Sequence, residues 1–410
     1  MLKNRHSLIG QIGDRDVFYE NPNMSFFNEK LRFETCQVSL ATNRILKLIY
    51  KSIAQITTTT LTDSTEGLCA DSRASLNNTM YLAARDSLEL FLAIVPVKYS
   101  QTINSNIRMG CVFFNDCLYI AHNCTIFTFY IKNKSKSRDD KSIGTFAKAA
   151  SFVDFIPRFR SLGEQVLNAH IDQQRSLLFD LLDKVNITPC SNTLLTIIGS
   201  ATTDSTLCNS KNDLQNATLV VKHFENLSSQ LIAVLQESAY ERVMGHLLEC
   251  VIRAAMVPIL NATLISEDDC RNVVNIYKTL QATKTIFPIL SKVENKLNGS
   301  TNSGGMYNGG LIDVHNINTF DATFSLDRDS SNDVPTYEND QIIISLIACW
   351  SKFVTLVDIL QYSISEMIEL LPRKRFQLFT PQEMAGLVKA LFQNSPKRQN
   401  LLQAISEVVM

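Results

Sequence analysis

The sequence from Phe379 to Val409, FTPQEMAGLVKALFQNSPKRQNLLQAISEVV, indicates the kind of fold this chain adopts. Thr380, Pro381 and Glu383 form a helix start, because an N-cap threonine, a proline at the first helical position and a glutamate at the third make a capping box. Ser395 and Pro396 repeat the cap and the proline. Apolar residues then recur at the spacing of one helix face. They are Met384, Leu387, Val388, Leu391 and Phe392 in the first helix, and Leu401, Leu402, Ile405, Val408 and Val409 in the second. The stretch predicts a hairpin of two amphipathic helices, a unit for packing or docking.

Helical periods also run through most of the remaining chain. Met109 to Ile131 is apolar on nearly every side and predicts a buried helix, and Leu214 to Val257 is the longest helical region. Asp71 to Val95 predicts a helix that Pro96 ends, since proline lacks the backbone N–H. Gln341 to Leu371 predicts one further helix. Ser266 and Asp269 form a second capping box ahead of another apolar stripe.

Composition supports the same fold class. Of the 410 residues, 45% are hydrophobic and 19% are charged, with only 14 Gly and 10 Pro, which provides for a sizeable core and few tight turns. No apolar/polar alternation persists for more than a few residues. We predict an all-α protein. The formal net charge of −1 offers no overall basic field for nucleic acid.

The periodic segments and their breaks predict five parts. Residues 1–32 have no sustained period and are expected to be flexible. Residues 33–190 form a first helical bundle and residues 191–297 a second. Residues 298–339 begin with NGSTNSGGMYNGG and continue as an acidic tract with too few apolar residues for a core, so a disordered linker is expected. Residues 340–410 complete the terminal bundle.

The sequence is compatible with two cellular locations, the secretory pathway and the cytoplasm. Ten cysteines at irregular spacings and numerous Asn-x-Ser/Thr sequons, such as those at Asn77, Asn123 and Asn226, would suit a secreted or lumenal glycoprotein with disulfides. Against this, the N-terminal residues MLKNRHSLIGQIGDRD have no apolar signal segment, and no run of about 20 apolar residues is present. The sequence favours reduced thiols in the cytoplasm and keeps the glycoprotein as the alternative.

No motif in the sequence predicts catalysis, a cofactor or a metal. Cys117, His122 and Cys124 are the nearest approach to a zinc site, but the spacing places both cysteines on one side of a buried helix. The Gly-rich SGGMYNGG (residues 303–310) lacks the Gly-Lys-Ser/Thr ending of a phosphate loop. Asp154 and the Asp139-Asp140 pair have no positioned partner that would make them general acids or bases. We therefore predict a protein that is not an enzyme; an all-α metalloenzyme remains a distant alternative.

The terminal hairpin carries the best candidate for a binding surface. Lys389, Lys397 and Arg398 lie among an excess of cations after residue 372. Such residues form either an ordinary solvated face or an electrostatic dock for an acidic partner, which would act mainly on association rate and orientation. They are the partner-binding residues that the sequence predicts.

Several segments, in order, resemble the C-terminal half of the Zeste-white ten family from about Phe33 to the end. They include SLELFLAIVPVKY (residues 87–99), FFNDCLYIAHN (residues 113–123), SFVDFIPRFRSLGEQ (residues 151–165), ISEDDCRNVVNIYKTL (residues 265–280) and GLVKALFQNSPKRQNLLQAI (residues 386–405). Each segment alone is a weak match, but several in one order at similar spacing are specific.

The resemblance implies an elongated rod of stacked helical bundles, the fold of tethering complexes. It implies a scaffold subunit that works with Rod and Zwilch at mitotic kinetochores, supports the spindle checkpoint and connects indirectly to dynein and dynactin. It also implies a tether for Golgi-derived vesicles at the endoplasmic reticulum, where a counterpart of Rod is the partner. Membrane association would come through partners only, and the locations would be the cytoplasm, the peripheral endoplasmic reticulum membrane and the kinetochore. The family's N-terminal half has no counterpart here, and its contacts are not carried over.

Overall fold

The structure is a computed structural model, which describes residues 9–12, 33–58, 70–136, 151–185, 187, 210–287, 343–371 and 376–407. Within these ranges the fold is all-α, as predicted, apart from one antiparallel strand pair, β1 (Ile9–Ile12) and β2 (Cys36–Ser39), in which Ile9 lies opposite Ser39. Strands of four residues are too short for alternation to reveal them. The predicted linker 298–339 lies outside the described residues, as does the predicted flexible segment 1–32 apart from β1.

The chain forms two compact units. One comprises residues 1–185 and 222–251, and the other comprises residues 186–221 and 252–410. The boundary falls twice inside a helix, in α9 (Ser210–Leu231) and in α10 (Glu237–Leu260). Residues 232–236 connect these helices, so the long predicted helical region from Leu214 to Val257 is two helices and a short connection.

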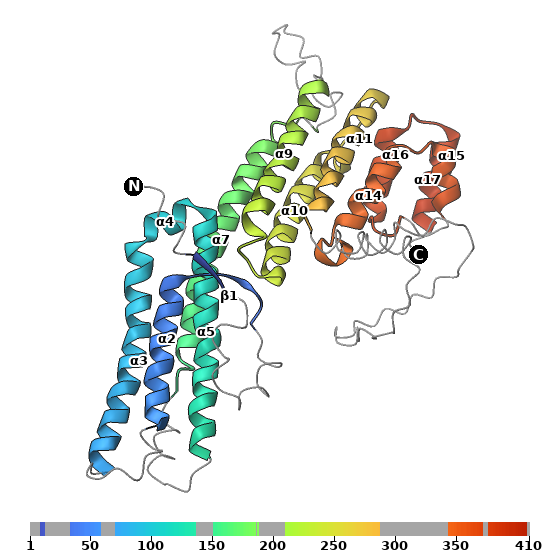
Figure 1. Cartoon of the computed structure of the whole chain (residues 1–410). Helices are drawn as coiled ribbons and strands as arrows, with labels where there is room; N and C mark the ends of the chain where they lie inside the picture. The colour runs from blue at the N-terminus through green and yellow to red at the C-terminus, as the bar shows by residue number, and fades with distance from the viewer. Residues whose placement is uncertain are drawn as a thin grey trace, which may run out of the picture. The chain divides into compact units, whose positions relative to one another are not determined.

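The first unit is built on long helices that run side by side: α2 (Leu40–Thr58), α3 (Ala70–Lys98), α5 (Ile107–Lys136) and α7 (Phe155–Leu182), with the short α4 (Ser100–Ser105) between α3 and α5 (Figure 1). α5 is buried along most of its length, as its apolar sequence predicts. Its core partners are largely aromatic. They include Phe91, Phe152, Phe155 and Phe159, which pack with Phe113 and Phe127 of α5 itself, and each of the six is 3% exposed or less.

The prediction that Pro96 ends its helix is wrong, because α3 continues to Lys98. Pro96 lies in the last turn, where its missing N–H removes only one bond to a carbonyl one turn earlier. The Tyr99 amide still donates to the Val95 carbonyl at 3.1 Å, and the Ile103 amide to the Tyr99 carbonyl at 2.9 Å, so the chain turns helically into α4.

The second unit contains α11 (Glu267–Gln281), the 3₁₀ turn η3 (Ala282–Ile286), α14 (Trp350–Ile359), α15 (Ile364–Leu370), α16 (Pro381–Leu391) and α17 (Pro396–Glu407). Tyr277 is buried in the core of the second unit. Its ring centroid lies 5.0 Å from that of Phe353, and its hydroxyl donates to the Ala255 carbonyl at 2.7 Å. The Ser266–Asp269 capping box is present as predicted. The single helix predicted for Gln341 to Leu371 is wrong, because a new capping box at Ser363 and Glu366 starts α15.

One helix in the described chain, α10, has the length and apolar composition that crossing a membrane requires. More than half of its apolar stretch is buried inside the protein, including Leu247, Leu248 and Ile252. Core helices of water-soluble proteins share these features, so the finding is weak evidence for a membrane span.

Candidate functional site

The terminal hairpin forms as the sequence predicts. The Thr380 hydroxyl accepts from the Glu383 amide at 3.2 Å, and a Glu383 carboxylate oxygen accepts from the Thr380 amide at 2.8 Å, completing the capping box of α16. Ser395 caps α17 by accepting from the Arg398 amide at 3.3 Å. Leu387 and Val388 are fully buried, whereas Leu391 and Phe392 are only partly buried.

Glu383 does more than cap its helix. Both of its carboxylate oxygens accept from Lys352 Nζ of α14 at 2.8 Å, and that ammonium lies 5.1 Å from the centroid of the Phe379 ring. Burial would raise the pKa of Glu383, but the Lys352 ammonium and the hydrogen bonds from Thr380 lower it, so the carboxylate remains ionised. In addition, the Ile265 amide donates to the Ala390 carbonyl at 2.9 Å. The hairpin is thus held by polar contacts to α14 and to the segment before α11.

The three predicted binding residues differ in their surroundings. Lys389 and Lys397 are exposed on α16 and α17. Arg398 is partly buried, and its Nη1 donates to the Phe392 carbonyl at 2.7 Å, which closes the loop between the two helices. The exposed positive charge therefore comes from the two lysines, while Arg398 also stabilises the loop that positions them. The cations at 373–375 lie outside the described residues.

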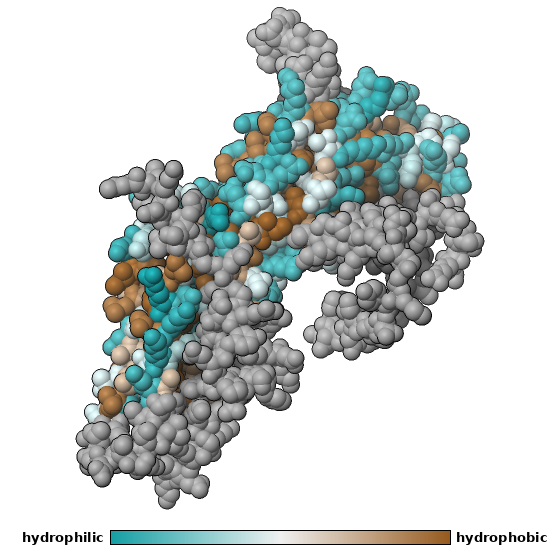
Figure 2. Space-filling view, in the orientation of Figure 1, coloured by the Kyte–Doolittle hydropathy of each residue, from teal (hydrophilic) through white to brown (hydrophobic). Residues whose placement is uncertain are grey.

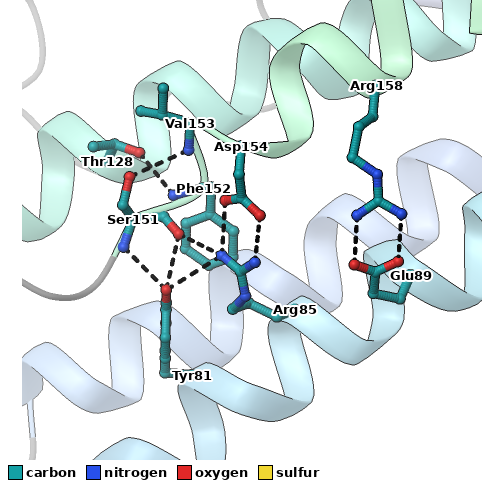
Figure 3. Close-up of polar contacts among 9 residues, drawn as sticks. All are labelled: Tyr81, Arg85, Glu89, Thr128, Ser151, Phe152, Val153, Asp154 and Arg158. Atoms are coloured by element: carbon teal, nitrogen blue, oxygen red, sulfur yellow. Dashed lines mark hydrogen bonds and ion pairs between the residues drawn. The ribbon is translucent and has the colours of Figure 1, made fainter.

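The segment Ser151–Gln165 forms the start of α7 and a polar contact with α3 (Figure 3). Arg85 Nη1 donates to the Ser151 carbonyl at 2.6 Å and to Asp154 Oδ1 at 2.9 Å, and Arg85 Nη2 pairs with Asp154 Oδ2. The Tyr81 hydroxyl also donates to the Ser151 carbonyl, at 2.8 Å. One turn along α3, Glu89 accepts from both Arg158 guanidinium nitrogens at 2.5 and 2.7 Å.

These contacts give Asp154 a structural role, as the ion-pair partner of Arg85. The Arg85 guanidinium keeps the pKa of Asp154 below its ordinary value, so the carboxylate holds no proton to donate at neutral pH. Asp154 precedes α7 but makes no capping bond with its side chain. The sequence indicated no positioned partner for Asp154, but the structure places Arg85 against it as an ion-pair partner from α3. The Asp139-Asp140 pair and residues 303–310 lie outside the described residues.

α5 and α7 approach each other closely at two glycines. A Cβ on Gly163 of α7 would lie 2.9 Å from the Cβ of Cys117 on α5, and a Cβ on Gly110 of α5 would lie 2.2 Å from Nε2 of His170 on α7. His170 is buried, and its Nε2 donates to the Ile103 carbonyl at 2.7 Å, since a carbonyl can only accept. The helix pair thus depends on two positions without side chains.

Asn115 and Asp116 of α5 bind the segment around β2. Asn115 Nδ2 donates to the Gln37 carbonyl at 2.9 Å and to the Val234 carbonyl at 2.7 Å, and the Gln37 amide donates to the same Val234 carbonyl at 3.0 Å. Asp116 Oδ1 accepts from the Ser39 amide at 2.7 Å. Two adjacent buried polar residues therefore join α5 to β2, and Asn115 also joins it to the connection between α9 and α10.

Burial raises the pKa of Asp116 to about 7, although the bonds from Ser39 and Thr42 oppose the shift. The folded protein therefore binds a proton between pH 4 and 7 that the unfolded chain has lost, so Asp116 lowers stability increasingly as pH rises through this range. We expect Asp116→Asn to be stabilising relative to the native chain at pH 8, with the difference in unfolding free energy growing by about 4 kcal/mol from pH 4 to pH 8. Urea unfolding at several pH values measures it.

Asp154→Asn provides the control of opposite sign. The pKa of Asp154 is lowered, so this carboxylate stabilises the fold above its ordinary pKa, and that contribution disappears as pH falls. The two variants should therefore diverge from the native chain in opposite directions at pH 8. A difference between Asp116→Asn and the native chain that is constant with pH would contradict the prediction.

The cysteines in the described ranges behave as core residues. Cys111, Cys117 and Cys124 are fully buried on α5, and burial raises the pKa of the Cys111 and Cys124 thiols to about 12. All seven described cysteines are free thiols. Where side chains are described, no group of three or more His, Cys, Asp and Glu residues could hold a metal ion. The Asn123 sequon is buried, its side chain bonding Tyr50 and the Tyr119 carbonyl, so it cannot carry a glycan in this fold.

Sequence reasoning did not single out Arg85, Asn115, Gly110 or His170. Asn115 had a local signal, because two adjacent polar residues interrupt a stretch that is otherwise apolar all round. Arg85 and Gly110 had none, since their partners lie 69 and 60 residues away along the chain.

Comparisons with known proteins identify one family and several distant relatives. Residues 31–180 match the model of a protein family described as centromere/kinetochore protein zw10, C-terminal. This range holds the contacts of Arg85 and Gly163 and the bond from Asn115 to Gln37, whereas Val234 and the terminal hairpin lie outside it. The chain is 24% identical over 375 residues to a centromere/kinetochore protein zw10 homolog of Arabidopsis thaliana, which covers 92% of this chain. It is 22% identical over 391 residues to that of Rattus norvegicus, which covers 94%. In both cases the match spans 41% of the relative's length.

Proposed function

Because this chain belongs to the zw10 family, which it matches through the family's C-terminal domain, we propose that it acts as a scaffold subunit and not as an enzyme. The family is a non-catalytic scaffold family. We propose a role in the mitotic spindle checkpoint at kinetochores, in a complex with a Rod-like helical subunit and Zwilch, with dynein and dynactin reached indirectly. A second proposed setting is the tethering of Golgi-derived vesicles at the endoplasmic reticulum, with the counterpart of Rod as partner and no direct membrane contact.

The observation that supports this proposal best is that charged side chains of the described residues form ion pairs between structural elements. Arg85 and Asp154 pair with each other, as do Glu89 with Arg158 and Lys352 with Glu383, all between helices. Such pairs orient helices, and the pKa of each of these three carboxylates is lowered, so that none of the three is suited to donate a proton at neutral pH. Helices held by such pairs, with exposed cations on the terminal hairpin, suit a protein that binds other proteins.

For the partner surface we propose the hairpin, with Lys389 and Lys397 as the exposed charges that attract an acidic face of the Rod-like subunit. Arg398 contributes charge at its edge and holds the loop through the Phe392 carbonyl. Attraction between exposed charges acts mainly on the rate of association and weakens with salt.

Charge reversal tests the hairpin. We expect Lys389→Glu combined with Lys397→Glu to reduce association of the full chain with the Rod-like subunit by at least tenfold at low salt, measured as the association rate constant by surface plasmon resonance. The matched control is Lys47→Glu combined with Lys51→Glu, the same charge change at exposed positions of α2. Equal rates for both double variants would place the dock elsewhere. Failure of the native chain to bind either large helical partner would refute the scaffold proposal itself.

A further inference from the structure

The long helix α3 has apolar residues on two opposite faces. Ala84, Leu88 and Phe91 on the inner face are buried in the core of the first unit. On the outer face Leu90, Ile94 and Val97 are 57%, 49% and 75% exposed. Figure 2 shows hydrophobic surface where the C-terminal half of α3 runs in Figure 1. Large apolar side chains gathered on one exposed face, unlike scattered ones, are a common feature of interaction surfaces.

The exposed residues of this face follow a seam spacing. The outer positions alternate three and four residues apart over the described part of α3, which is the repeat by which two helices pack side by side. They are Leu76, Thr79, Ala83, Asp86, Leu90, Ala93 and Val97, all exposed. Leu82 and Ile94 flank this seam and widen the apolar surface. The small residues at 79, 83 and 93 would allow a second helix to approach closely.

Asp86 lies at the centre of the seam and determines what can pack there. None of the ion pairs found among the described side chains involves it. In a pair of identical α3 helices, either parallel in register or antiparallel about the centre, the two Asp86 carboxylates would face each other, which is unfavourable. A partner helix with Lys or Arg at its central seam position would instead neutralise Asp86.

We propose that this outer face of α3 binds an amphipathic helix of a different polypeptide, whose apolar seam covers Leu90, Ile94 and Val97 and whose central Lys or Arg pairs with Asp86. The bound segment spans about 22 residues, or about 33 Å of helix, to match the seam. The surface is separate from the cationic hairpin, so the inference does not depend on the function proposed above.

Synthetic helical peptides test this surface on the full chain. One peptide of about 22 residues carries leucines at its seam positions and Lys at the central one, and a matched peptide carries Glu there instead. Because Asp86 lies at the centre of the seam, the central Lys of the peptide lies opposite it whether the peptide binds parallel or antiparallel to α3. By fluorescence anisotropy we expect the Glu peptide to bind at least tenfold more weakly than the Lys peptide, and Asp86→Lys to reverse the preference.

Variants of the apolar residues complete the test. Leu90→Gln and Val97→Gln should each weaken binding of the Lys peptide at least tenfold, whereas Leu219→Gln, at an exposed leucine of α9, should not change it. These positions are exposed, so all variants should keep the native circular dichroism spectrum. Equal binding of the two peptides, or no binding of either, would overturn the proposal. A dimer of the native chain in sedimentation equilibrium that Leu90→Gln converts to monomer would also overturn it, since the occupant would be a second copy.

Discussion

Gly110→Ala should destabilise the first unit by about 3–5 kcal/mol. The new Cβ would lie 2.2 Å from Nε2 of His170 and 3.2 Å from the Ile103 carbonyl oxygen, so the imidazole must move. Overpacking a close helix contact costs about 1–3 kcal/mol. A buried imidazole and carbonyl that lose their shared bond cost about 1–3 kcal/mol more. Urea unfolding followed by circular dichroism measures the change.

Two other helical glycines make the comparison quantitative. Gly163→Ala meets the Cys117 Cβ at 2.9 Å and should also be destabilising, because a Cβ moves only with its backbone. Gly386→Ala on α16 has its nearest atom, the Leu260 carbonyl oxygen, at 4.0 Å. In the absence of a clash, replacing glycine by alanine inside a helix stabilises by about 1 kcal/mol. A double variant, Gly110→Ala with His170→Ala, should lose less than the sum of the two single changes, because the clash is relieved. If Gly110→Ala were as mild as Gly386→Ala, the close approach of α5 and α7 would be refuted.

Asn115→Leu should destabilise the first unit by about 3 kcal/mol and loosen β2 selectively. The leucine has a similar size but donates no bond, so the Gln37 and Val234 carbonyls both lose the Nδ2 donor. Each lost bond is worth about 1 kcal/mol net, and a buried acceptor left without its partner costs about 1–3 kcal/mol. The Gln37 amide bonds the same Val234 carbonyl, so its hydrogen exchange should accelerate.

Asn123→Leu is the matched control on the same helix. Asn123 is also fully buried, but its Nδ2 donates to the Tyr119 carbonyl of its own helix and its Oδ1 accepts from the Tyr50 hydroxyl. Its loss should reduce stability without changing exchange at Gln37. Equal acceleration at Gln37 in both variants would mean that Asn115 has no special role in holding β2.

Local sequence predicted the helix starts well. The capping boxes at Thr380 and Ser266 form as expected, because their bonds join residues three apart and need only the local backbone. The buried character of α5 was equally clear from its composition. The end of α3 was missed because proline near the last turn costs little, and the start of α15 was missed although Ser363 and Glu366 carry the same capping pattern.

By itself the sequence determined the all-α class, the terminal hairpin and the absence of recognisable catalytic motifs, since these follow from periodicity and residues close together along the chain. Only the tertiary structure decided the close approach at Gly110 and Gly163, the binding of β2 by Asn115 and the pairing of Arg85 with Asp154. It also decided how the hairpin is divided: Lys389 and Lys397 are exposed, while Arg398 holds the loop. The physical reason is that such contacts join residues tens of positions apart, and burial sets their strength, which no local pattern records.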